Sequence, residues 1–203
     1  MDEPLLLILS SPSGAGKTTL THRLLQNPQM QITFSVSLTT RPPRPNEVDG
    51  QDYHFTDAET FQQRVAGGEL LEWACVHGNL YGTARSEIDR ARQLGKRVLL
   101  FDVDYQGARQ IRAAIPRAVG VFILPPSLGE LRRRLESRGT ETPQSLERRF
   151  AKAKEEIEHY SLFDYIVVND DLQQALAELT GIIHAELSRR SRRALRAEAM
   201  LRE

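Results

Sequence analysis

The chain has 203 residues, of which 40% are hydrophobic, and its 27 lysines and arginines balance its 27 aspartates and glutamates. This length predicts a single domain that can bury a normal core, with room for inserted lobes. Zero net charge argues against a dedicated nucleic-acid-binding protein, because such proteins usually carry a basic excess.

The sequence favours a reducing, aqueous compartment. Cys75 is the only cysteine, so an intrachain disulfide is excluded. The chain starts with acidic residues followed by the short apolar run Leu5–Leu9, which is unlike a signal peptide. No run approaches the ~18 apolar residues that a membrane span needs. We therefore expect a soluble, cytoplasmic protein without a membrane or nucleic-acid partner, and leave a homo-oligomer open.

Short apolar runs alternate with segments of helical pattern along most of the chain. The predicted strands are Leu5–Leu9, Val98–Val103, Val119–Leu124 and Tyr165–Val168. The predicted helices are Thr18–Leu25, Gly107–Ala114, Leu128–Glu136, Leu146–His159 and a last helix from about Leu172. All-apolar strands alternating with helices indicate a parallel sheet covered on both faces. The fold class is therefore α/β.

Two stretches interrupt this alternation. Residues 34–95 contain "TTRPPRPNEVDG" and mixed aromatic pieces, which predict an inserted lobe with its own small sheet. Residues 137–145, "SRGTETPQS", are rich in turn formers and predict a mobile flap between two helices. We divide the chain into a core (about 1–33, 96–136 and 150–203), a lobe (about 34–95) and a lid (about 137–149).

The stretch "SPSGAGKTT" follows the first predicted strand and points to a bound phosphate. It fits the phosphate-loop pattern G-x-x-x-x-G-K-[ST] with Ser11 in place of the first glycine. Gly14 and Gly16 can adopt positive φ, so that backbone N–H groups converge on an anion. Lys17 adds a charge for the β and γ phosphates, and the Thr18 hydroxyl suits Mg²⁺. A plain strand-to-helix turn is the alternative, and the Lys-Thr pair argues against it.

Two carboxylates end the second long strand, in "VLLFDVDYQG". Alternation by two places Asp102 and Asp104 on the same side of a strand. At the carboxyl end of a strand beside the phosphate loop, they can hold Mg²⁺ through water or contact a ligand. A solvated strand end is the alternative.

Arginines suggest a second phosphate and a closing flap. Arg41 and Arg44 lie three apart among prolines, so in a polyproline II helix they face the same way and suit a phosphate. Arg134 and Arg138 share a helix face, and Arg149 lies beyond the flap. Arginines on a closing flap neutralise phosphoryl charge and exclude water. The alternatives are a proline-rich surface turn and a charged helix face.

The chain resembles the guanylate kinase family. The matching stretches, in order over about residues 5–171, are "SPSGAGKTTL", "VSLTTRPPRPNEVDGQDYHF", "LLEWACVHGNLYGT", "LFDVDYQGARQIR", "FILPPS", "LRRRLESRGTET" and "HYSLFDYIVVNDD". Ser11 departs from the usual first glycine, a position that needs only a small residue. Thr83 stands where some members have serine, and keeps the hydroxyl.

The resemblance assigns a role to each matching position. It implies that the acceptor phosphate is held by Ser37, Arg41, Arg44, Tyr53 and Tyr81, and guanine by Glu72, Thr83 and Asp104. It implies that ATP is held by Ser11, Pro12, Ser13, Gly14, Ala15, Gly16, Lys17, Thr18, Thr19 and Asn169. The implied catalytic residues are Lys17, Arg134, Arg138 and Arg149, and the implied metal ligands are Thr18 and, through water, Asp102.

The guanine assignment also has a chemical basis. Guanine presents N1–H and N2–H₂ donors side by side, and an ionised carboxylate only accepts hydrogen bonds, so Glu72 fits that edge. Adenine offers an acceptor at N1, which would face the carboxylate unpaired. A charge at a helix end is an equally good interpretation of Glu72 from its sequence context alone.

The resemblance implies Mg²⁺-dependent transfer of the ATP γ-phosphoryl group to GMP, with dGMP as a further acceptor, within purine nucleotide metabolism. Two alternatives stay open: a non-catalytic interaction module with this fold, and a kinase of another phosphate acceptor. The five histidines suggest no metal pair, and the arginines between Arg189 and Arg202 are interpreted as a solvated helix end.

Overall fold

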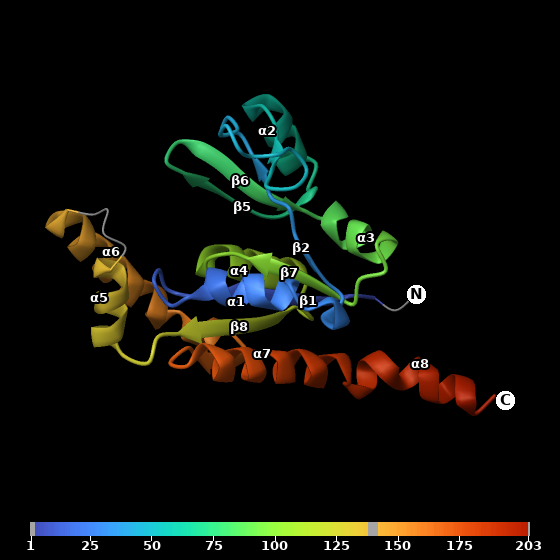
Figure 1. The fold of residues 1–203 in the computed structure, drawn as a ribbon. Coiled ribbons are helices and arrows are strands. Elements are labelled where there is room, and N and C mark those ends of the chain that lie inside the picture. The colour runs from blue at the N-terminus through green and yellow to red at the C-terminus, as the bar shows by residue number, and fades with distance from the viewer. Residues whose placement is uncertain (1–2, 138–141, 203) are drawn as a thin grey trace.

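The structure, a computed structural model, describes residues 3–137 and 142–202. Its core is a five-stranded sheet with the strand order β2-β7-β1-β8-β9, in which every pairing is parallel. These strands are β1 (Leu5–Ser10), β2 (Ile32–Phe34), β7 (Val98–Asp102), β8 (Val119–Leu124) and β9 (Tyr165–Val168). The α/β class and the central parallel sheet are confirmed (Figure 1).

Strand β1 shows why the apolar runs form a sheet that is covered on both faces. Leu5, Leu7 and Leu9 pack in the cluster that includes α1 (Lys17–Leu25) and α7 (Leu172–Leu187). The alternate residues Leu6 and Ile8 pack in a second cluster with α3 (Ser86–Gln93) and α4 (Tyr105–Ala114). All six residues of the strand are buried, as a central parallel strand requires.

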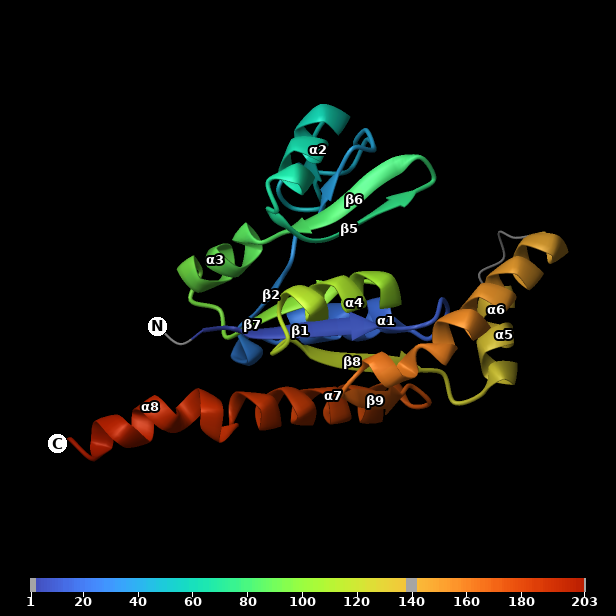
Figure 2. The same ribbon diagram turned by 180° about the vertical axis from the view of Figure 1, so that it is seen from behind.

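A second sheet forms within the segment predicted to be an inserted lobe. Its order is β4-β3-β6-β5, with β3 (Leu38–Thr39), β4 (His54–Phe55), β5 (Leu70–Val76) and β6 (Asn79–Ala84). Helix α2 (Ala58–Ala66) supplies Phe61 to a small core with Leu38, Leu70 and Ala84. Figures 1 and 2 show the lobe over the α4 side of the core sheet, and β5 contacts α4.

Helices α5 (Leu128–Glu136) and α6 (Pro143–Glu158) pack on each other through Leu131, Leu135 and Ala153. Helix α6 begins three residues before the predicted start at Leu146, because Thr142 caps it and Pro143 occupies its first turn. Residues 143–145, which were predicted to belong to the flap, are therefore the first residues of α6, and residues 138–141 of the predicted flap lie outside the described residues.

The C-terminal region forms two helices, because α7 ends at Leu187 and α8 (Arg190–Met200) follows after a break. In Figures 1 and 2, α8 projects from the end of the core opposite α5 and α6. Two 3-10 turns, η1 (Pro28–Met30) and η2 (Tyr160–Leu162), complete the described elements. Within residues 3–137 and 142–202, no helix has the length and hydropathy to cross a bilayer.

Candidate active site

The loop between β1 and α1 has the conformation predicted for a phosphate cradle. Gly14 and Gly16 both have φ of 93°, in the left-handed region that favours glycine. Gly16 caps α1 and no side chain hydrogen-bonds to the helix start, so the first-turn N–H groups keep their capacity for an anion. A side chain at Gly16 would also meet Asn169 Nδ2, at 2.3 Å from its Cβ.

Buried Asn169 fixes this loop from the end of β9. Its Nδ2 donates to the Ala15 carbonyl at 2.8 Å. Within the loop, the Ser11 hydroxyl and the Ala15 N–H donate to the Pro12 carbonyl at 3.1 and 3.2 Å. Asn169, predicted near the adenine, is thus placed against the loop that is expected to hold the phosphates.

Lys17 and Asp102 meet because β1 and β7 are parallel neighbours in which Leu9 is paired with Asp102. Their side chains form an ion pair, and Lys17 Nζ also donates to the Val103 carbonyl at 3.2 Å. Thr18 and Thr19 follow on the first turn of α1, both exposed.

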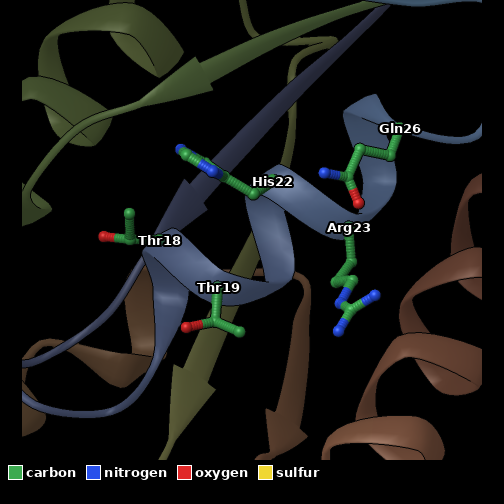
Figure 3. A pocket seen from close by; sticks show the side chains of 5 residues that line it. All are labelled: Thr18, Thr19, His22, Arg23 and Gln26. Carbon is green, nitrogen blue, oxygen red and sulfur yellow. The ribbon is translucent and has the colours of Figure 1, made fainter.

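A shallow hollow of about 370 Å³ runs along α1 from Thr18 and Thr19 past His22 and Arg23 to Gln26. Figure 3 shows these side chains on the helix, with Thr18 at its start. One helix alone lines the hollow, so it does not account for a site that needs the loop, the lobe and α6.

The donor set fits Mg²⁺ bound together with phosphates. Within residues 3–137 and 142–202, no group of three or more acidic, histidine or cysteine side chains is arranged so that it could hold a metal ion. Thr18 and Asp102 supply oxygen ligands, and Mg²⁺ typically takes only one or two protein ligands besides phosphate and water. The residues present therefore fit a metal that arrives with a nucleotide.

The prediction that strand alternation orients Asp102 and Asp104 together is wrong, because β7 ends at Asp102. Asp104 caps α4, and its Oδ1 accepts from the N–H groups of Gln106 and Gly107 at 2.9 and 3.0 Å. Asp104 therefore lies towards the lobe, where it adds to the rise that burial causes in the pKa of Glu72, while Asp102 forms an ion pair with Lys17 of the loop.

The predicted guanine-binding residues Glu72 and Thr83 are brought together by the β5–β6 register. The Thr83 hydroxyl donates to Glu72 Oε1 at 2.7 Å, and both side chains are buried. Burial is the main cause that raises the pKa of the Glu72 carboxyl, with Asp104 adding to it, while the Thr83 hydrogen bond opposes the rise.

Three of the predicted acceptor-phosphate residues, Arg41, Tyr53 and Tyr81, form a cluster on the lobe. The Arg41 guanidinium lies 5.4 Å from the Tyr53 ring centroid, and the Tyr53 and Tyr81 rings are 6.0 Å apart in an edge-on arrangement. Glu47 is the main cause that raises the pKa of Arg41, and Tyr81 adds to the rise. Ser37 lies just before β3, with its carbonyl accepting from the His54 N–H at 2.9 Å.

Glu47 accepts hydrogen bonds from both arginines of the "TTRPPRP" stretch. Both Glu47 oxygens accept from Arg41 Nη2, at 2.7 and 2.9 Å, and Oε2 also accepts from the Arg44 N–H at 2.8 Å. Arg41 is the main cause that lowers the pKa of Glu47, with the Arg44 N–H second. Arg44 contacts Glu47 through its backbone and its side chain is exposed, so the expectation that Arg41 and Arg44 face one phosphate together stays a prediction.

Two of the three predicted catalytic arginines reach the loop side of the site. Arg149 Nη2 donates to the Ser13 hydroxyl at 2.9 Å. Arg134 donates to Glu130 at 2.7 Å and to the Asn169 carbonyl at 3.0 Å. Arg133 and Arg134 together lower the pKa of Glu130 to about 2. Arg138 lies outside the described residues.

Comparison with known proteins identifies this combination of loop and lobe. The family model described as Guanylate kinase matches residues 3–186. The chain belongs to the guanylate kinase family. It is 52% identical to the guanylate kinase of Maricaulis maris (strain MCS10), over 92% of this chain and 85% of that protein.

Two further relatives extend the match. The guanylate kinase of Vibrio parahaemolyticus (serotype O3:K6) is 46% identical over 99% of this chain and 97% of its own length. The crystal structure of guanylate kinase from Anaplasma phagocytophilum superposes with a TM-score of 0.72 at 34% identity, covering 95% of this chain and 90% of that one. Family membership and the fold, both expected from the motifs, are confirmed.

The structure adds three residues to the site that the sequence analysis did not assign. Glu47 lies within the motif used to recognise the guanylate kinase family, and its position three residues after Arg44 was the available signal. Gly107 faces the predicted guanine-binding residue Glu72, since a Cβ there would lie 3.3 Å from Glu72 Oε2. Glu156 accepts from the Ser13 N–H at 3.0 Å.

Glu156 could have been suspected from helix periodicity. It lies three residues after the buried Ala153 on α6, so a carboxylate falls on the buried face of that helix. Buried carboxylates need partners, and the partner here is a backbone N–H of the phosphate loop.

Proposed function

We propose that this chain catalyses transfer of the γ-phosphoryl group from ATP to GMP, giving ADP and GDP. The observation that carries the proposal is the buried Glu72–Thr83 pair, which lies beside Asp104 on the same chain as a complete phosphate loop. The loop accounts for a nucleotide donor and the buried carboxylate for a purine with adjacent N–H groups. The relatives named guanylate kinase support the same reaction.

The donor is held by the loop from Ser11 to Thr19. Amide N–H groups at the start of α1 and the Lys17 ammonium contact the β and γ phosphates. Asp102 orients Lys17 through its ion pair. Thr18 and, through water, Asp102 would hold Mg²⁺, which would supply positive charge against the phosphates.

The acceptor is held by the lobe. Glu72 accepts from the N1–H and N2–H₂ groups of guanine, while Thr83 and Asp104 complete the pocket. Arg41, Tyr53 and Tyr81, with Ser37 and Arg44, hold the GMP phosphate in line with the donor. The ribose 2′-hydroxyl has no role in this assignment, so dGMP serves as a further acceptor.

The transferred phosphoryl group meets arginines from outside the lobe. Arg149 already lies at Ser13, and Arg134 lies beside Asn169. Both bring positive charge to the loop, where the transition state spreads negative charge over the phosphoryl oxygens. Arg138 completes this set of arginines as a prediction from sequence. Closure of the lid and a cytoplasmic location are further predictions of the same kind.

The two alternatives have less support. A non-catalytic module does not need Lys17 and Thr18 at the start of a glycine-capped helix, and this chain has both. A kinase of another acceptor does not need the buried Glu72–Thr83 pair.

The test is a coupled assay of ADP release with the purified chain, ATP and Mg²⁺, comparing GMP, AMP, CMP, UMP and dTMP. A site that hydrogen-bonds a base edge discriminates by ~10⁴–10⁵, so GMP is expected to exceed the others by orders of magnitude in kcat/KM. A comparable kcat/KM with another nucleotide would contradict the proposed acceptor. No ADP release with any of them would contradict the enzyme.

A further inference from the structure

A second concave region lies at the far end of the molecule from the phosphate loop. It has a volume of about 1010 Å³ and lies between α8, the end of α7, the segment before β7 and the start of β8. We call it the α8 cavity. The phosphate loop follows the carboxyl end of β1, whereas Glu3, Arg97 and Val119 of this cavity lie at the amino ends of β1, β7 and β8. Figures 1 and 2 show α8 and the start of β1 at the same end of the core.

The charge of the α8 cavity differs from that of the whole chain. Eight basic side chains line it against three carboxylates, Glu3, Asp164 and Glu186, although the chain has 27 of each charge. The local excess is five positive charges. A net charge of zero for the chain therefore conceals a strongly basic concave surface.

The three carboxylates already have arginine partners. Glu3 pairs with both Arg92 and Arg117, and Glu186 pairs with Arg189. Asp164 pairs with Arg112, which is not part of the cavity wall. The acidic groups of the cavity are thus committed to ion pairs.

Several cations of the cavity have no such partner. Within residues 3–137 and 142–202, no carboxylate lies in ion-pair distance of Arg97, Arg192 or Arg196. Arg192 donates to the Glu3 backbone carbonyl at 3.3 Å, which fixes its guanidinium at the cavity. Burial is the main cause that lowers the pKa of Arg192; attraction by Glu186 and Glu3 opposes this fall, and repulsion by Arg117 and Arg189 adds to it. An anion between these guanidinium groups relieves that repulsion.

We propose that the α8 cavity binds a small polyphosphate anion, free or as the phosphate chain of a nucleotide. Guanidinium groups bind phosphate oxygens in paired hydrogen bonds, and several arginines together match several linked phosphoryl groups. The volume is that of a pocket for a small ligand. A concave wall favours a small anion over a nucleic-acid strand, which needs an extended track of positive charge.

The test measures binding to the full chain by titration calorimetry at about 150 mM salt, where loose attraction between surface charges is screened. Inorganic tripolyphosphate and ATP are titrated separately without metal. Wild type is expected to bind two equivalents of each, one at the phosphate loop and one at the α8 cavity. The variant R192Q/R196Q is expected to bind one, or the second at least ~10-fold more weakly, because two guanidinium groups are lost.

The matched control is R64Q/R109Q, which removes the same charge at residues that line neither the cavity nor the proposed active site. It is expected to keep both equivalents. Arg97 lies outside α8, so Arg97→Gln serves as a second variant if the substitutions on α8 unfold that helix. Arg97→Gln is also expected to weaken anion binding at the α8 cavity. Both cavity variants are expected to keep ADP release within about 2-fold, because neither touches the loop or the lobe.

The two probes separate the sources of the anion. Equal affinity of the second site for ATP and tripolyphosphate identifies recognition of the phosphate chain alone, and tighter ATP binding identifies a nucleotide; both support the proposal. A single equivalent in wild type that R192Q/R196Q retains, or unchanged binding of two equivalents in R192Q/R196Q, overturns it. The proposal is also overturned if a single-stranded RNA binds the chain in a way that requires Arg192 and Arg196, while tripolyphosphate does not bind at the α8 cavity.

Discussion

At the scale of single residues, the proposed guanine pocket depends on a glycine as well as on its carboxylates. A Cβ at Gly107 would lie 3.3 Å from Glu72 Oε2 and 3.0 Å from Val103 Cβ. Both distances are shorter than an ordinary van der Waals contact. The carboxylate that we assign to guanine is therefore positioned partly by the absence of a side chain on α4.

Gly107→Ala is expected to lower kcat/KM for GMP about 10-fold and to cost about 1–3 kcal/mol of stability, because the methyl group displaces Glu72 or Val103. Steady-state kinetics and thermal unfolding measure the two effects. Gly181→Ala is the control, since a Cβ there meets nothing within 4 Å and helix propensity improves. A Gly107→Ala variant with wild-type kinetics would show that the packing is not tight.

Glu72 is also expected to destabilise the protein without ligand. A carboxyl with a raised pKa in the fold costs stability above that pKa, and the cost disappears as the pH falls below its ordinary value of 4.5. Glu72→Gln is therefore expected to unfold at a higher temperature than wild type at pH 7. The difference shrinks towards pH 4.

Thermal unfolding at a series of pH values measures this difference. Glu69→Gln, at an exposed residue nearby, is expected to show none. A lower melting temperature for Glu72→Gln at pH 7 would mean that the Thr83 hydrogen bond outweighs the burial of the charge.

At the scale of elements, α6 is tied directly to the phosphate loop. Glu156 accepts from the Ser13 N–H and Arg149 donates to the Ser13 hydroxyl, so two residues of one helix hold one residue of the loop. A shift of α6 therefore changes the shape of the cradle.

Glu156→Gln is expected to raise KM for ATP about 5-fold with little change for GMP, because a neutral acceptor replaces a charged one at the loop amide. Glu158→Gln on the exposed side of α6 provides the comparison. Equal KM values for ATP in the two variants would remove Glu156 from the positioning of the loop.

The elements that sequence analysis predicted well have a strong local signal. Runs such as Val119–Leu124 are apolar throughout, so burial on both faces fixes them as central strands whatever surrounds them. The strands β3 and β4 have only two residues each and are stabilised by pairing with segments that are distant in sequence. No local sequence pattern predicts such pairing.

The site residues were predictable to different degrees for the same reason. The phosphate loop needs only local conformation, and the positive φ of Gly14 and Gly16 was foreseen. The pairing of Arg41 with Glu47 depends on how the chain turns between them, and Asp104 was misplaced because a helix start replaced the expected strand end. The contact of Glu156 with Ser13 joins residues 143 positions apart.

At the scale of the whole molecule, the lobe has a much smaller core than the central sheet. Leu38, Phe61, Leu70 and Ala84 form its buried cluster, whereas the central sheet is packed on both faces. A domain with this division is expected to open locally at the lobe before it unfolds globally.

Native-state hydrogen exchange is expected to show lower opening free energies for β3, β5 and β6 than for β1, β7 and β8. GMP at 100 times its Kd is expected to raise the opening free energies of the lobe amides by up to ~2.7 kcal/mol, because it binds the lobe only when the lobe is folded. Lobe amides as well protected as those of β1 without ligand, or unaffected by GMP, would contradict this description.

Recognition of guanine by the buried carboxylate of Glu72 is tested most directly by kcat/KM for GMP in the Glu72→Gln variant. We expect a fall of about 5- to 150-fold, the ~1–3 kcal/mol cost of disturbing a buried hydrogen-bonded group, with KM for ATP unchanged and Glu69→Gln like wild type. A wild-type value for GMP in Glu72→Gln would contradict the account.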